Sequence, residues 1–225
     1  MARSDYDNSE YRLDSGMIIS FHKEGLDERR NVLILLHGLG AHSGTWRKNI
    51  PYLSRQGRII IAPMLSRGDV SPRSGTIETH VSHIGELISK LEIQRACIVG
   101  NSMGGWIAMR LAILYPEIVN CLVLEDTAGV GATTDENIET EKKRNSLLEK
   151  VNETSIPILI IWGRHDSIIA LEEGKVANAA IKKSTLVVFD NAGHVPHWEQ
   201  PDEFNTTVEK FLLRFERNSS SAHPH

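Results

Sequence analysis

Ser102 stands at the centre of the sequence GNSMG, between the apolar run at residues 96–99 and a helix-like segment. A serine at the apex of so tight a turn takes a strained backbone with positive φ, and its hydroxyl rises above the sheet. Gly100 and Gly104 suit this turn, because a Cβ at either place would collide with the adjacent strand or helix. The context therefore predicts a nucleophile rather than a serine in an ordinary turn.

A serine hydroxyl needs a base to take its proton, and the base needs a carboxylate to fix its tautomer. Both residue types follow later strand-like runs: Asp166 comes after IPILIIWG, and His194 comes after TLVVFD. Asp126, at the end of CLVLED, is the alternative acid, but the location of Asp166 is the commoner one. His197 and His165 are alternative bases, and we favour His194 because it directly follows a glycine at its loop apex.

Acyl transfer also needs two backbone N–H groups directed at the developing oxyanion. Met103 follows the nucleophile and begins a helix, whose positive end adds to the field. Leu39, in the glycine-flanked loop after NVLILLHG, is the expected second donor. Further residues expected to contact substrate flank these groups: Gly38, Asn101 and Val195. For Asn101, an amide that caps the turn is an equally good interpretation.

Elements that could position these residues recur along the chain. From residue 32 onward, continuous apolar runs of strand length alternate with helical patterns, which predicts an α/β fold with a mostly parallel sheet and helices on both faces. Residues 11–24 predict a hairpin, and residues 1–10 an unpaired end. We expect one domain over residues 1–217, with a short charged cap segment at 128–155 and an unstructured tail at 218–225.

The composition argues against several classes of protein. The net charge is −4 and no basic stripe is present, so a nucleic-acid partner is not expected. No apolar run approaches the roughly 20 residues that span a bilayer, and the first residues lack a secretion signal, which predicts a cytoplasmic protein without a membrane span. Cys97 and Cys121 are expected as small buried hydrophobic residues, with a disulfide the less favoured alternative. No motif indicates a metal or another cofactor.

Four motifs in this order resemble the α/β-hydrolase family: HGLG with Trp46, GNSMGG, IPILIIWGRHD and GHVPHWEQPDEF. The resemblance covers residues from about 11 to 215. It implies an α/β-hydrolase fold with Ser102 as nucleophile, His194 as general base and then acid, and Asp166 as its orienting carboxylate. It also implies that Leu39 and Met103 donate to the oxyanion.

Within that family, GNSMGG and CLVLEDTAGVG are similar to hydrolases that split carbon–carbon bonds in ring-cleavage products of aromatics. Those enzymes carry a helical cap where this chain has only residues 128–155, so the cap is expected to be minimal. They also tend to have an aromatic residue after the catalytic histidine, where this chain has Val195.

The sequence therefore predicts a serine hydrolase that cleaves a small or medium carboxylic ester through an acyl-enzyme, without a cofactor. One alternative is a carbon–carbon bond hydrolase acting on a ring-fission ketone. Another is a non-catalytic ligand receptor or regulator on the same fold.

Overall fold

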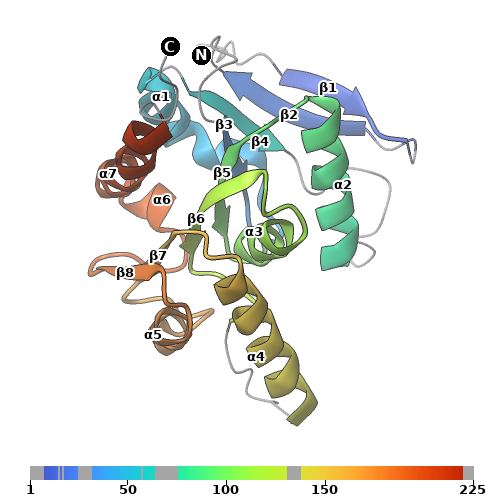
Figure 1. Cartoon of the computed structure of the whole chain (residues 1–225). Helices are drawn as coiled ribbons and strands as arrows, with labels where there is room; N and C mark the ends of the chain where they lie inside the picture. The colour runs from blue at the N-terminus through green and yellow to red at the C-terminus, as the bar shows by residue number, and fades with distance from the viewer. Residues whose placement is uncertain are drawn as a thin grey trace.

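Eight strands form one sheet in the computed structural model of the chain, which describes residues 8–14, 16, 18–24, 32–56, 58–63, 76–130 and 138–219. The order across the sheet is β1-β2-β4-β3-β5-β6-β7-β8 (Figure 1). The strands span β1 Asn8–Arg12, β2 Ile18–Glu24, β3 Val32–Leu36, β4 Ile59–Pro63, β5 Ala96–Asn101, β6 Val119–Glu125, β7 Ile158–Gly163 and β8 Ser184–Phe189.

Helices cover both faces of this sheet (Figure 1). The 3-10 helices are η1 Ser43–Lys48 and η2 Ser54–Gln56, and the α-helices are α1 Ile50–Leu53, α2 Ile77–Lys90, α3 Met103–Leu114, α4 Ile138–Glu153, α5 Leu171–Ala180, α6 Pro196–Glu199 and α7 Pro201–Ser219. Successive strand residues point to opposite faces, so β3 supplies Ile34 to the core under α2 and α3, and Leu35 to the core under α1 and α7. Apolar residues at every position of β3 reflect this double coverage.

The predicted α/β fold with a mostly parallel sheet is confirmed. From β4 to β8 every neighbouring pair is parallel, while β1–β2 and β2–β4 are antiparallel. Parallel strands bring their carboxyl ends to one edge, and ligands bind at that edge in such sheets. The segments after β3, β5, β6, β7 and β8 all begin there.

Several elements differ from the sequence-based prediction. β1 begins at Asn8, where residues 1–10 were predicted to be unpaired. The loop after β8 contains the short helix α6. Helix α7 continues through Ser219, two residues into the predicted tail, and residues 220–225 lie outside the described part.

The charged segment at 128–155 is partly buried. It forms α4, and the apolar side chains of Leu147, Leu148 and Val151 are buried in the main core. Their spacing puts them on one face of the helix, so the final turns pack against the domain, while Glu149, Lys150 and Glu153 are exposed. Residues 131–137 of this segment lie outside the described part.

Cys97 and Cys121 are both buried and form no disulfide, as the favoured interpretation predicted. They are register partners on β5 and β6, so their proximity reflects sheet pairing rather than a covalent link. Among the described helices, none is long and apolar enough to cross a membrane.

Candidate active site

Ser102 occupies the turn between β5 and α3 with φ 52° and ψ −117°, a conformation that L-residues rarely adopt. A Cβ on Gly100 would lie 2.4 Å from the Gly104 carbonyl carbon, and one on Gly104 would lie 2.2 Å from the Leu36 carbonyl oxygen. Both glycines are therefore required for the strand, the turn and the helix to pack this closely, as predicted. The turn directs the serine side chain away from its own backbone.

Backbone hydrogen bonds on both sides hold this strained residue. The Ser102 N–H donates to the Glu125 carbonyl oxygen at 2.9 Å, and the Ser102 carbonyl accepts from the Gly105 N–H at 3.0 Å and the Ala128 N–H at 3.1 Å. A strained backbone conformation persists only where the surrounding contacts hold it in place, and such residues are concentrated at functional sites.

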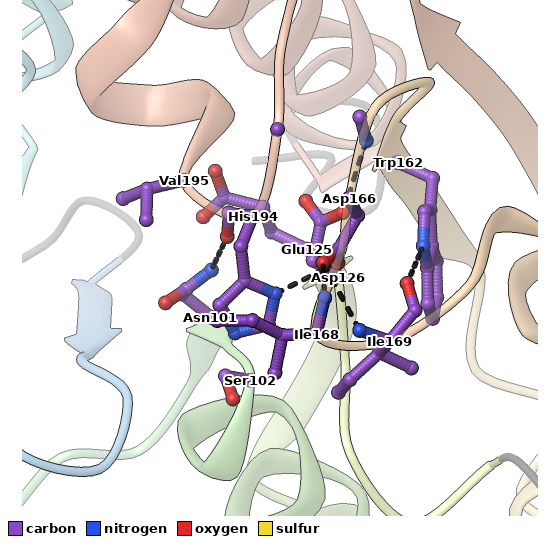
Figure 2. Close-up of polar contacts among 12 residues, drawn as sticks. Asn101, Ser102, Glu125, Asp126, Trp162, Asp166, Ile168, Ile169, His194 and Val195 are labelled. Atoms are coloured by element: carbon purple, nitrogen blue, oxygen red, sulfur yellow. Dashed lines mark hydrogen bonds and ion pairs between the residues drawn. The ribbon is translucent and has the colours of Figure 1, made fainter.

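His194 and Asp166 form a hydrogen-bonded pair beside the elbow (Figure 2). His194 Nδ1 lies 2.7 Å from Asp166 Oδ2, and the Asp166 side chain is fully buried. Asp166 Oδ1 accepts from the N–H groups of Ile168 at 2.7 Å and Ile169 at 3.0 Å. Because a carboxylate only accepts, Nδ1 carries the proton, which leaves Nε2 free to take one from a hydroxyl.

The electrostatics of Asp166 favour its ionised form. Burial alone would raise the pKa of Asp166, but the hydrogen bonds from His194 and from the two backbone N–H groups hold that pKa below its usual value. An ionised carboxylate at this position would stabilise an imidazolium if the histidine accepted a proton.

Asn101 connects the histidine loop to the elbow. Its Nδ2 donates to the His194 carbonyl oxygen at 3.0 Å, which brings the imidazole and Ser102 to the same edge of the sheet (Figure 2). Among the described contacts, no hydrogen bond joins the serine hydroxyl to the imidazole. Such bonds are often loose without substrate and tighten when it binds. The predicted substrate contact of Asn101 stays a prediction, since its amide is used between the two loops.

The loop that carries His194 passes very close to the end of β7. A Cβ on Gly163 would lie only 1.9 Å from the Gly193 carbonyl oxygen, so no larger residue fits there. On its other side the loop is held by Glu199, whose Oε2 accepts from the Gly193 N–H at 2.9 Å and whose Oε1 accepts from the Val195 N–H at 3.0 Å. One carboxylate thus binds the N–H groups on both sides of His194.

Replacing Glu199 with Gln should loosen the histidine loop. A glutamine keeps one acceptor oxygen but turns an NH₂ group toward the other N–H, so one hydrogen bond is lost. We expect a roughly fivefold fall in kcat with KM nearly unchanged, because that is about the effect of one hydrogen bond. The measurement is steady-state kinetics of this variant alongside Glu203→Gln, an exposed control on α7. Equal kinetics of the Glu199 and Glu203 variants would contradict the positioning role.

The loop after β3 lies against the elbow. A Cβ on Gly38 would lie 3.2 Å from the Ser102 Cβ. The Gly38 carbonyl accepts from the His37 ring at 2.8 Å and from the Ala41 N–H at 3.2 Å. This peptide is trans, so the N–H of Leu39 points opposite to that fixed carbonyl.

His37 orients this peptide as a neutral donor. It is fully buried, and desolvation lowers the pKa of His37 below its usual value. Met103 begins α3, and its N–H therefore has no acceptor within the helix. Both predicted oxyanion donors thus belong to segments that adjoin Ser102.

The rival residues have other partners. His197 is fully buried, its Nδ1 lies 2.7 Å from Glu125 Oε2, its Nε2 lies 2.8 Å from Thr45 Oγ1, and it stacks on Trp46. His197 therefore joins the segment after β3 to the end of β6. His165 is exposed. The rival acid, Asp126, is buried, and its Oδ1 accepts from the Gly163 N–H at 3.0 Å.

Metal binding is the other chemistry that this cluster could support. Donor atoms of Asp126, Asp166 and His194 all lie within 4.8 Å of one another. A cation there would have to displace the hydrogen bond between Nδ1 and the Asp166 carboxylate, and the described partners fit a hydrogen-bonded series better.

Sequence reasoning named the residues at the centre of the site but missed those that support it. Glu199, Gly163, Glu125 and Thr45 carried no signal, because each acts through a backbone group or a neighbour that only the fold supplies. Val195, predicted to contact substrate, lies half-buried beside His194, and its N–H is bound by Glu199.

Residues 31–154 and 130–201 match the alpha/beta hydrolase fold family. Together these segments cover most of the chain, and the protein belongs to this family of hydrolases. The two matched segments overlap at 130–154, where the short segment containing α4 stands.

The most informative relative is a 2-hydroxy-6-oxononadienedioate/2-hydroxy-6-oxononatrienedioate hydrolase of Pseudomonas putida. It is 26% identical over 267 aligned positions, covering 88% of this chain and 94% of the relative. The aligned stretch is longer than this whole chain of 225 residues, so the relative has segments with no counterpart here.

Solved structures give the same fold. A meta-cleavage product hydrolase from Pseudomonas fluorescens IP01 has a TM-score of 0.74 at 24% identity, covering 92% of this chain and 97% of its own. A structure described among carboxylesterases of the thaumarchaeon Nitrososphaera gargenis has a TM-score of 0.78 at 17% identity. The match covers 93% of this chain and 100% of the other. At these identities the likeness establishes the fold and leaves the substrate open.

Proposed function

We propose that the protein is a serine hydrolase that cleaves small or medium carboxylic esters through an acyl-enzyme. The observation that carries the proposal is the His194–Asp166 pair, with Nδ1 bound and Nε2 free, next to a serine at a strained turn. A proton acceptor beside a hydroxyl is what activates a weak nucleophile.

In the proposed reaction, Nε2 of His194 takes the Ser102 proton while Oγ attacks the ester carbonyl. The N–H groups of Leu39 and Met103 stabilise the resulting oxyanion. His194 then gives its proton to the leaving alcohol as the carbon–oxygen bond breaks. Water, activated by the same imidazole, attacks the acyl-enzyme and releases the acid and Ser102.

A short cap supports an ester substrate of limited complexity. Only residues 128–155 separate the β6 loop from β7, and the longer alignment of the Pseudomonas putida relative indicates that this chain lacks segments found there. Less covering protein favours an open site and broad specificity. The large exposed side chains of Leu39 and Ile168 favour substrates with apolar groups.

A panel of p-nitrophenyl esters of increasing chain length tests this function. We expect turnover of the short and medium esters, and labelling of Ser102 by a fluorophosphonate probe. A protein that neither turns over the esters nor reacts with the probe would instead fit the non-catalytic receptor.

Carbon–carbon bond hydrolysis is the second candidate, favoured by the hydrolase named above, which aligns over 94% of its length. This activity predicts cleavage of a 2-hydroxy-6-oxo-dienoate ring-fission product, followed as loss of its yellow colour, with little turnover of simple esters. Running both substrate types at matched concentrations separates the two functions by their ratio of kcat/KM values.

A further inference from the structure

Asp126 is a buried carboxyl group that the proposed reaction does not use. It follows β6 directly, is 0% exposed and has φ 42°, a conformation that is strained for a residue other than glycine. Its N–H donates to the Ile161 carbonyl at 3.0 Å, and its Oδ1 accepts from the Gly163 N–H at 3.0 Å. Both bonds hold the side chain at the end of β7, where the chain continues to Asp166.

The second oxygen of Asp126 has an unusual neighbour. Oδ2 is buried and meets no N–H or O–H donor among the described residues. The Asp126 carboxyl group lies beside that of Asp166: one ligand atom each of Asp126, Asp166 and His194 lie within 4.8 Å of one another. Two carboxylate oxygens attract each other only when a proton lies between them.

The charged groups around Asp126 also oppose its ionisation. Burial, the adjacent Glu125 carboxylate and the contact with Asp166 together raise the pKa of Asp126 to about 10. The nearest imidazoles do not compensate, because His197 is bonded to Glu125 and His194 is bonded to Asp166.

We propose that Asp126 is a neutral carboxylic acid whose Oδ2–H donates to Asp166 and thereby positions the carboxylate that holds His194. The proposal rests on the function proposed above. Asp126 acts through Asp166 and is a positioning residue. Its bond completes a set in which two backbone N–H groups, the imidazole and one acid all donate to Asp166. It also draws negative charge away from the histidine, which keeps the imidazolium from becoming too stable.

Two substitutions test the donor. Asn at position 126 can donate its amide N–H to Asp166 and accept from Gly163, so Asp126→Asn should keep kcat/KM and the midpoint of the acidic limb of its pH profile. Leu cannot donate, so Asp126→Leu should lose about 10- to 100-fold in kcat/KM, as for a lost hydrogen bond to a charged group. Its acidic limb should move to higher pH, which a purely structural defect would not produce.

Infrared spectroscopy tests the proton without any activity. At neutral pH the wild-type protein should show a carboxylic acid C=O band that is absent from Asp126→Asn. Asp190→Asn, which removes an exposed carboxylate paired with Arg164, should leave that band unchanged. This measurement still decides the proposal if the ester assay fails or if Asp126→Leu does not fold.

Stability against pH gives a third readout with a defined sign. The folded-state pKa of about 10 lies above the ordinary value of 3.8, so between these values the folded state holds a proton that the unfolded state has released. Wild-type stability should therefore fall relative to that of Asp126→Asn as pH rises through this window. Any of three results would show that Asp126 is ionised and overturn the proposal. The stabilities of the two proteins could keep the same difference across this pH window, or the wild-type protein could lack the C=O band. The acidic limb of the pH profile could also move to lower pH in Asp126→Asn.

Discussion

Ser102→Ala is expected to lower kcat/KM for ester hydrolysis by about a millionfold, the loss seen when a serine–histidine–carboxylate unit loses its nucleophile. Without Oγ no acyl-enzyme can form. The imidazole and the oxyanion N–H groups remain, and they can assist only the direct attack of water. Steady-state kinetics with the best ester of the panel measures the fall, and mass spectrometry should find no fluorophosphonate adduct on the variant.

The chain offers a matched control for this substitution. Ser155 is also a serine with positive φ, at 56°, and it is exposed in the turn that directly follows α4. Ser155→Ala therefore repeats the same change of side chain at another residue with positive φ, and activity should be retained. Full activity of Ser102→Ala, or probe labelling of that variant, would remove Ser102 from the mechanism.

The sheet could be predicted from the sequence because its strands are covered on both faces. Continuous apolar runs such as VLILL in β3 are typical of strands buried on both faces, and their alternation with helical segments indicates parallel pairing. The burial of α4 was harder to predict. Charged residues dominate its sequence and conceal the apolar face formed by Leu147, Leu148 and Val151.

The proximity of Asp166 and His194 could also be predicted, because parallel strands deliver their following loops to one edge of the sheet. The sequence favoured Asp166 over Asp126 only because its location is the commoner one, since both residues follow neighbouring strands. The choice depends on hydrogen-bond partners: backbone N–H groups and the imidazole donate to Asp166, whereas burial and Glu125 oppose the ionisation of Asp126.

Asp166→Asn is expected to lower kcat by about ten-thousandfold, because the amide reverses the hydrogen bond to the imidazole. The substituted side chain would donate its amide N–H to Nδ1 of His194, which moves the ring proton to Nε2. A protonated Nε2 cannot accept the proton of Ser102, so the nucleophile stays inactive although the groups keep their places. Asp190→Asn, on the loop after β8, removes an exposed carboxylate near the same loops and should leave kcat nearly unchanged.

The same variant tests whether Asp126 can replace the lost acid. A buried neutral acid with Oδ1 bound to Gly163 N–H cannot supply the negative charge that the imidazolium needs, so Asp126→Asn should cause little further loss in the Asp166→Asn background. If Asp166→Asn instead kept a tenth of wild-type kcat and lost it only when Asp126 was also replaced, the carboxylate after β6 would be acting as the acid. That result would overturn the assignment of Asp166, because two acids that replace each other cannot have the fixed roles of carboxylate and proton donor.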